Sequence, residues 1–326
     1  MLFRSLAALF HPATAEGALL ALEQLPESPA PDVVRGYARE EAARAVADFD
    51  ASLAVDPNED DGERLLHDSL MTRARVQALN ALRAVALLGD GASIRFAIDS
   101  LASHDTTQVA NALEALDSFG EHTIVRPLLR LWEPADRRRL PRDVWLPRLL
   151  HDPDPWIRGC AALLRGTTRK DAPMTDALAT MSDVERVLFL RKVPLFAELA
   201  PQDLRTVAAV ADERAFVDGE TIAGQGEPGD ELHIVIDGAV RVVREDPDTG
   251  TDVELATRTQ GDVVGEMALI TREPRMASLV ASGEVRTLRL GRTEFEGVLR
   301  ERPDTAIAVI RVLSSRLVES ARGRDT

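Results

Sequence analysis

The hydrophobic pattern changes its period partway along the chain. From residue 13 to about residue 166, apolar residues recur every three or four positions in a background rich in Ala, Leu and Arg, which is the spacing of amphipathic helices. Between residues 214 and 290, short segments rich in Val, Ile and Thr alternate with turn signals such as GQGEPGDE and DPDTGT, which is typical of strands. The pattern predicts an all-helical part followed by a strand-rich part.

Helical spacing in the first part predicts helices near residues 31–54, 64–88, 93–103, 106–118, 122–132, 136–149 and 154–165. Two segments, NALRAVALLGD and NALEALDSFGE, are self-similar, and HDPDPWIRGCAALLRG repeats them loosely. Repeated helix pairs indicate a solenoid, in which each pair buries its apolar face against the next pair. The last of these segments, in its form D-x-D-x-W-I-R-x-x-A-A-L, resembles HEAT repeats.

A polar stretch, GTTRKDAPMTDA, separates the two parts. We predict a helical repeat domain over residues 1–170, a linker over residues 171–181 and a second domain over residues 182–326. The second domain should begin with helices near 183–192 and from Pro201 to about Glu213.

The strand-rich region should form a small antiparallel barrel or jelly roll, because its turn signals are regularly spaced. Asp237-Gly238 is expected to join LHIVI to AVRVVRE as a tight hairpin. Two closing helices are predicted near residues 292–301 and 303–320. The fold class is therefore a multidomain α plus β chain, with a helical solenoid before a β jelly roll.

Composition narrows the possible functions. The formal net charge of −15 repels nucleic-acid phosphates and anionic lipid headgroups. The single cysteine, Cys160, cannot form an internal disulfide, which fits a reducing cytoplasm. No apolar run approaches the roughly 20 residues needed to span a bilayer. We interpret the opening MLFRSLAALFHPATA as an amphipathic helix rather than as a signal peptide.

Three His-Asp dipeptides raise the possibility of a metal-dependent phosphohydrolase, since such sites use adjacent His and Asp ligands. They are His67-Asp68, His104-Asp105 and His151-Asp152. The second and third precede predicted helices, where Asp accepts hydrogen bonds from backbone N–H groups as an N-cap. We favour the capping interpretation, and expect neither a metal site nor catalytic residues.

The segment GEMALITREPRMASL carries the features of an anion site. Gly265 permits a close backbone approach, and the short helix that follows points its N–H groups and positive dipole end forward. Pro274 ends the helix, and the Arg275 that follows can direct its guanidinium back toward the same pocket. The planar arrangement of the guanidinium N–H groups suits phosphate oxygens. Glu266 can accept a hydrogen bond from a ribose hydroxyl.

This segment resembles the phosphate-binding cassette of cyclic nucleotide-binding domains, the family that includes the catabolite activator protein and the regulatory subunits of protein kinase A. The resemblance implies an eight-stranded jelly roll, a helical lead-in and two closing helices. It also implies that Gly265 and Glu266 face the ribose, that the Ala268 N–H and Arg275 hold the cyclic phosphate, and that Ala277 and Ser278 line the strand beneath. Val264 stands where the family commonly has Phe, and Met276 where it has a small residue. The complete predicted binding set is Gly265, Glu266, Met267, Ala268, Arg275, Met276, Ala277 and Ser278.

The resulting hypothesis is a non-enzymatic, cytoplasmic sensor that binds cAMP, or else cGMP, and signals through its closing helices to the helical repeats or to a protein partner. The alternative is an interaction scaffold with a silent barrel, in which Glu266 and Arg275 form only a structural ion pair. Helical repeats followed by the lead-in ERVLFLRKVPLFAEL also resemble soluble tails of bacterial transporters similar to ATP/ADP carriers, which makes a transporter a candidate partner. Only ESARGRDT follows the last apolar repeat, so we expect no DNA-reading helix-turn-helix domain.

Overall fold

The computed structural model divides the chain into two compact units, Met1–Thr168 and Arg169–Thr326. It describes residues 17, 19, 21, 22, 30–89, 91–101, 103, 105–119, 121–133, 140–166, 181–197, 199, 201–246, 249–301, 307, 310 and 314. Three predictions lie wholly or mostly outside these residues: the opening amphipathic helix, the linker over 171–181, and the closing helix over 303–320.

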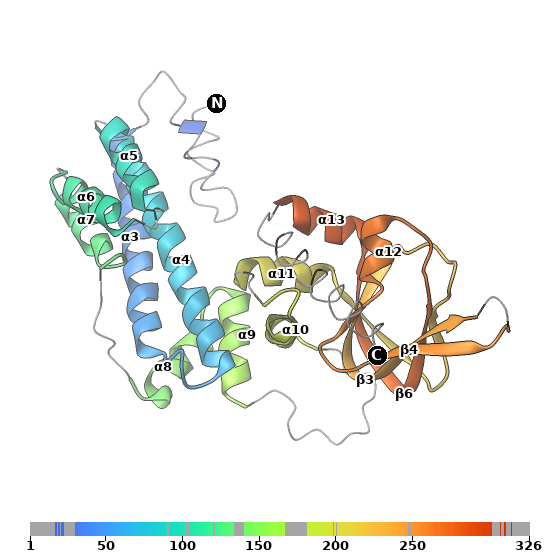
Figure 1. Ribbon diagram of the computed structural model, residues 1–326. Helices are drawn as coiled ribbons and strands as arrows, with labels where there is room; N and C mark the ends of the chain where they lie inside the picture. The colour runs from blue at the N-terminus through green and yellow to red at the C-terminus, as the bar shows by residue number, and fades with distance from the viewer. Residues whose placement is uncertain are drawn as a thin grey trace. The chain divides into compact units, whose positions relative to one another are not determined.

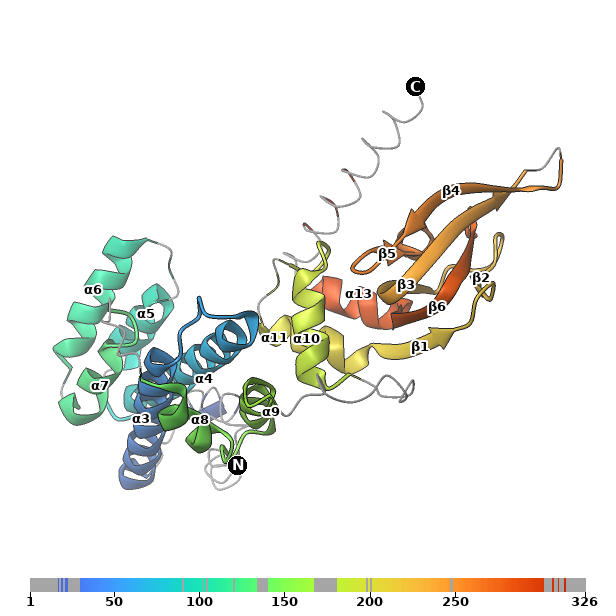
Figure 2. The same ribbon diagram turned by 90° about the horizontal axis from the view of Figure 1, so that it is seen from below.

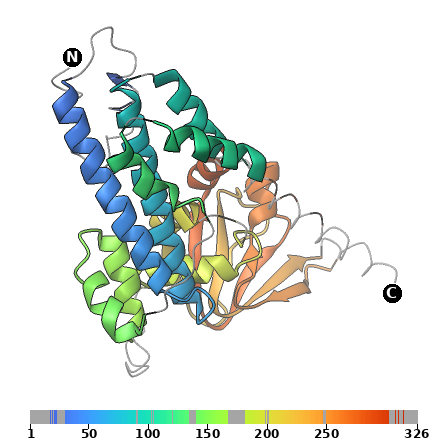
Figure 3. The ribbon, with the colours of Figure 1, turned by 90° about the vertical axis from the view of Figure 1, so that its left-hand side faces the viewer.

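The first unit is all-helical over its described residues, which confirms the helical prediction. Its helices are α3 (Pro31–Ala54), α4 (Asp61–Ala86), α5 (Gly91–Leu101), α6 (Thr106–Asp117), α7 (His122–Leu129), α8 (Arg142–Leu149) and α9 (Pro155–Leu164). The two long helices α3 and α4 lie side by side, and α9 packs against α4 (Figures 1 and 3). Helices α3 to α7 share one apolar core. The helical-repeat architecture stays a prediction.

The capping prediction concerns two of the His-Asp dipeptides, and their aspartates have different environments. Asp105 caps α6, as predicted, because its side chain accepts a hydrogen bond from the Thr107 N–H at 2.8 Å. The prediction for Asp152 is wrong. Asp154 caps α9, since Pro155 occupies the first helical turn, and Asp152 binds Arg73 instead.

Two further observations concern metal ions and membranes. Within the described ranges there is no group of three or more His, Cys, Asp or Glu side chains that could hold a metal ion. Of the helices the structure describes, none combines the length and the apolar character needed to cross a bilayer.

Replacing the cap Asp105 with Ala should reduce the free energy of unfolding of the first unit by about 1 kcal/mol, because one N–H group of α6 loses its acceptor. Urea unfolding followed by Trp emission measures this unit alone, since all three Trp residues lie in it. Asp99→Ala is the control: Asp99 is exposed near the end of α5, where Ala is a better helix former and no cap is lost. Equal losses in the two variants would contradict a capping role.

The second unit begins with two helices and continues as an antiparallel sheet. Its elements are α10 (Asp183–Lys192), α11 (Pro201–Val210), β1 (Asp212–Phe216), β2 (Thr221–Ala223), β3 (Glu231–Glu245), β4 (Asp252–Arg258), β5 (Val263–Val264), α12 (Glu266–Thr271), β6 (Ser278–Gly291) and α13 (Arg292–Glu301). The strand order is β1-β6-β3-β4, with β2 paired to β6 and β5 paired to β3 (Figure 2). Strands β3 and β6 form the centre of the sheet.

The predicted hairpin at Asp237-Gly238 is wrong, because β3 runs through these residues without a turn. Gly238 has φ +82°, and a Cβ there would stand 2.3 Å from the Glu284 carbonyl oxygen. The dipeptide marks a shift of register against β6, where two strands approach so closely that only glycine fits. The described residues form six strands rather than the eight that the resemblance implies.

Candidate functional site

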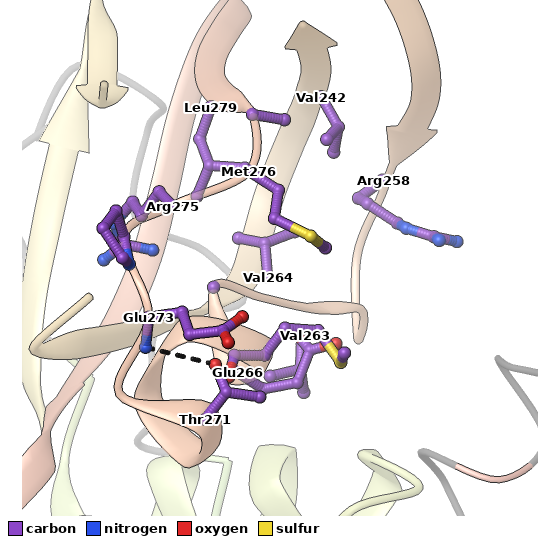
Figure 4. Close-up of a pocket in the computed structure, with 14 residues that line it drawn as sticks. Val242, Arg258, Val263, Val264, Glu266, Thr271, Glu273, Arg275, Met276 and Leu279 are labelled. Atoms are coloured by element: carbon purple, nitrogen blue, oxygen red, sulfur yellow. Dashed lines mark hydrogen bonds between the residues drawn. The ribbon is translucent and has the colours of Figure 1, made fainter. Parts of the chain in front are cut away.

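A pocket of about 190 Å³ lies between the segment around α12 and the sheet (Figure 4). Most of its wall comes from one stretch of chain that leaves β5, forms α12 and returns at the start of β6. Strands β3 and β4 supply Val242 and Arg258 from the other side. The full lining is Val242, Arg258, Val263, Val264, Gly265, Glu266, Met267, Thr271, Glu273, Pro274, Arg275, Met276, Ala277 and Leu279.

Gly265 allows the two ends of this segment to meet. It has φ +85°, a conformation that favours glycine. A Cβ at this position would stand 2.5 Å from Nη1 of Arg275 and 3.1 Å from the Glu231 carbonyl oxygen. Any larger residue would therefore displace the guanidinium, and the sequence requirement for glycine is steric as well as conformational.

Arg275 is the buried cation of the pocket, with only 5% of its surface exposed. Its Nη2 donates to the Glu231 carbonyl oxygen at 2.8 Å, and the guanidinium makes no ion pair with a carboxylate of any described residue. Burial lowers the pKa of Arg275, while the charges of Glu231, Glu227 and Asp230 oppose that shift. Burying a guanidinium that has no carboxylate partner costs free energy of desolvation. An anion bound in the pocket would offset this cost.

The backbone of Arg275 is fixed by the loop between β2 and β3. Its N–H donates to the Glu227 carbonyl at 2.9 Å, and its carbonyl accepts from the Gly226 N–H at 2.8 Å. The Ser278 hydroxyl supports the same loop by accepting from the Gln225 N–H at 2.9 Å. The guanidinium is thus held in place before any ligand arrives, which lowers the entropic cost of binding.

Glu231, whose carbonyl holds Arg275, is itself part of a polar cluster. Burial alone would raise the pKa of its carboxyl, but hydrogen bonds from Arg289 and His233 hold that pKa below its usual value. His233 is 1% exposed, and burial lowers its pKa. The imidazole also lies 3.0 Å from the Thr287 hydroxyl. These contacts anchor the strand on which the arginine rests.

Glu266 is 6% exposed and lines the same pocket as Arg275. Within the described residues no ion pair joins Glu266 to Arg275, although the scaffold alternative requires one, and the Arg275 guanidinium donates to the Glu231 carbonyl. Because α12 has only six residues, its dipole is small, and Arg275 is the main source of positive potential in the pocket.

The other predicted binding residues divide into three groups. Met267, Met276 and Ala277 line the pocket. The bulky Met276 is 65% exposed and extends toward the Arg258 side without filling the cavity (Figure 4). Ser278 is not part of the lining. Ala268 lies within α12, and its side chain is outside the described residues.

Sequence reasoning missed Val242, Arg258 and Glu273 as pocket residues. Arg258 faces the pocket because β4 pairs with β3 in a register that places it opposite Val240. The alternation of side chains along β4 indicates that Arg258 lies on one of the two faces of the sheet. It does not indicate that this face covers the cavity. Glu273 could have been predicted more easily, because it immediately precedes Pro274 and Arg275 in the sequence.

Comparison with known proteins agrees with this geometry. Residues 213–302 match the family described as Cyclic nucleotide-binding domain. The chain is 32% identical over 111 residues to the cAMP-dependent protein kinase regulatory subunit of Aspergillus niger, which covers 34% of this chain and 26% of that protein. The chain thus spans about a quarter of the length of this curated relative.

Two solved structures are also similar. The Thermus thermophilus Catabolite Activator Protein is 32% identical over 40% of this chain and 62% of its own, with a TM-score of 0.38. The regulatory domain of Toxoplasma gondii PKA with cAMP is 28% identical over 42% of this chain and 50% of its own, with a TM-score of 0.38.

From the family match, residues 213–302 form a cyclic nucleotide-binding domain. The family match covers none of the N-terminal helical part.

Proposed function

We propose that this domain binds a cyclic nucleotide, with cAMP the favoured ligand, and that the chain is a non-enzymatic regulatory sensor. The observation that carries the proposal is Arg275: a buried guanidinium that lines a pocket together with Glu266, without a carboxylate partner among the described residues. A cyclic phosphate would supply the missing negative charge and accept the two parallel hydrogen bonds that a guanidinium donates.

The pocket has a suitable group for each part of such a ligand. Arg275 would hold the cyclic phosphate, and Glu266 would accept a hydrogen bond from the ribose 2′-hydroxyl. The base would lie against the apolar wall formed by Val242, Val264 and Leu279, with Met276 over it. The match to a regulatory subunit named as cAMP-dependent favours adenine as the base.

The signal would leave the domain through α13. This helix follows β6 directly, and its Phe295 is 1% exposed. Arg272, at the end of the α12 segment, donates from Nη2 to Oε1 of Glu296 on α13 at 3.0 Å. A ligand that binds one arrangement of α12 and α13 more tightly than another would shift the population between them. We further propose a cytoplasmic location and a protein partner for the helical unit, with a membrane transporter among the candidates.

Calorimetric titration of the full chain with cAMP, cGMP and the corresponding cyclic pyrimidine nucleotides tests binding. Trp emission tests transmission in the same samples, because the three Trp residues and the single Tyr lie in the first unit and the pocket lies in the second. We expect heat with cAMP and a ligand-dependent change of emission. Heat without such a change would limit the proposal to binding, and no heat with any cyclic nucleotide would contradict it.

An interaction scaffold with a silent barrel is the second candidate. The observation in its favour is Phe96 on α5, which is 76% exposed beside a groove that α5 and α6 form together. An exposed aromatic at a groove is a common anchor in protein interfaces. This candidate predicts that no cyclic nucleotide produces heat and that Phe96→Ala weakens partner binding.

A further inference from the structure

Glu273 places a second carboxylate in the candidate site, and neither the resemblance nor the proposed function gives it a role. Its side chain lines the pocket, and Figure 4 shows the carboxylate directed inward on the side of Glu266. Its backbone N–H donates to the Thr271 hydroxyl at 3.3 Å. The Glu273 carboxylate forms no ion pair with a cation anywhere in the part of the chain that the structure describes.

The backbone on both sides holds Glu273 in this position. Arg272 has φ +62°, a left-handed conformation that reverses the chain after α12, and its side chain points to Glu296 on α13. Pro274 restricts the residue before it to an extended conformation. The loop therefore fixes the backbone of Glu273 at the edge of the pocket, and its side chain is exposed there.

Charges of both signs line the pocket. The carboxylates are Glu266 and Glu273, and the cations are the buried Arg275 and Arg258, whose guanidinium points away from Arg275 in Figure 4. A cyclic phosphodiester carries one negative charge. A linear phosphomonoester carries between one and a half and two near neutral pH, so repulsion from Glu273 acts on it about twice as strongly.

We infer that Glu273 is a specificity-determining residue that selects monoanionic cyclic nucleotides over dianionic linear ones. This inference rests on the proposed function, since it concerns ligands of the same pocket. Because Glu273 is exposed to water, repulsion between charges some 6 Å apart at an effective dielectric constant of about 40 to 80 corresponds to about threefold to tenfold in affinity for a monoanion. Because a dianion doubles the interaction energy, the factor for a linear nucleotide is about the square of that, or roughly tenfold to a hundredfold.

The test compares cAMP with adenosine 5′-monophosphate by calorimetric titration of the full-length wild type and Glu273→Gln. The variant should bind both ligands more tightly and should gain more for the monophosphate, so that the ratio of the two Kd values shrinks by about threefold to tenfold. The gain should be smaller at about 1 M salt than at about 0.01 M, where screening is weak.

Two control variants separate charge in the pocket from other effects. Glu284→Gln makes the same change of net charge at an exposed residue of β6 outside the lining, and should leave both Kd values unchanged. Arg258→Gln removes a positive charge from the pocket rim and should lower the affinity for both ligands. This decrease should be smaller than the increase in affinity caused by Glu273→Gln.

The outcomes are distinct for the two proposals. An unchanged ratio in Glu273→Gln, or weaker binding of cAMP, would overturn the role of Glu273 and leave the proposed function intact. If neither protein binds cAMP, the proposed function fails and the selectivity inference falls with it.

Discussion

Replacing Arg275 with Ala is expected to weaken cAMP binding by about 2–5 kcal/mol, which is roughly thirtyfold to several thousandfold in Kd. The guanidinium is the buried positive group nearest the proposed phosphate position, and the Gly226 and Glu227 backbone already fixes it there. Its removal takes away both charge and bidentate geometry. Calorimetric titration measures the loss directly.

The same substitution should change the stability of the unliganded domain by no more than about 1 kcal/mol. Among the described residues, the wild-type Arg275 side chain makes a single hydrogen bond, to a backbone carbonyl, and burial lowers its pKa. Removing a desolvated charge that lacks a carboxylate partner therefore relieves about as much free energy as the lost contacts cost. Scanning calorimetry tests this, since Trp emission does not report on the second unit.

Arg275→Lys serves as the matched control, because it keeps the charge and loses the planar fork. Its affinity should lie between those of the wild type and Arg275→Ala. Unchanged affinity in Arg275→Ala would remove the observation on which the proposed function depends. A large loss of stability would instead make Arg275 a structural residue, as the scaffold alternative holds.

Features determined by local sequence could be predicted closely. Helix α3 has the predicted bounds, because Pro31 can occupy only its first turn and an acidic loop follows its end. Helix α10 also begins and ends as predicted, between the Ser182 capping box with Glu185 and Val193. The residues that form most of the pocket are close in sequence, so the sequence alone could place Gly265, Glu266 and Arg275 around one pocket.

Features determined by distant contacts could not be predicted. Asp237-Gly238 has the composition of a hairpin turn, and only the Glu284 carbonyl on β6 shows why the glycine lies within a continuous strand instead. Arg258 reaches the pocket through the register between β3 and β4. In the first unit, the sequence indicated a cap for Asp152, whereas its actual partner lies 79 residues earlier in the chain.

That partner, Arg73, is a residue whose loss should strongly destabilise the first unit. Its guanidinium donates to Asp48 on α3 and to both carboxylate oxygens of Asp152, at 2.7 to 2.9 Å. The side chains of Asp48 and Asp152 are only 13% and 10% exposed. Arg73→Ala would leave two poorly solvated carboxylates facing each other, and the expected loss is about 3–5 kcal/mol at neutral pH.

The loss should depend on pH in a defined direction. In the wild type, burial raises the pKa of Asp48 despite Arg73. Burial would also raise the pKa of Asp152, but hydrogen bonds from Arg73 and the Asp154 N–H hold it below its usual value. Without Arg73 both folded-state pKa values rise. A carboxyl whose folded pKa lies above its unfolded value destabilises the protein at neutral pH, and that penalty disappears as pH falls through the folded pKa.

The difference in free energy of unfolding between wild type and Arg73→Ala should therefore be largest near pH 7 and shrink as pH falls toward about 4, the unfolded pKa of Asp. Urea unfolding followed by Trp emission gives this difference for the first unit at each pH. Arg126→Ala is the matched control: its ion pair with Asp117 is exposed by 61% and 49%, so its loss should be near zero at every pH. A deficit for Arg73→Ala below about 1 kcal/mol, or one that does not change with pH, would mean that water or other side chains already satisfy the two carboxylates.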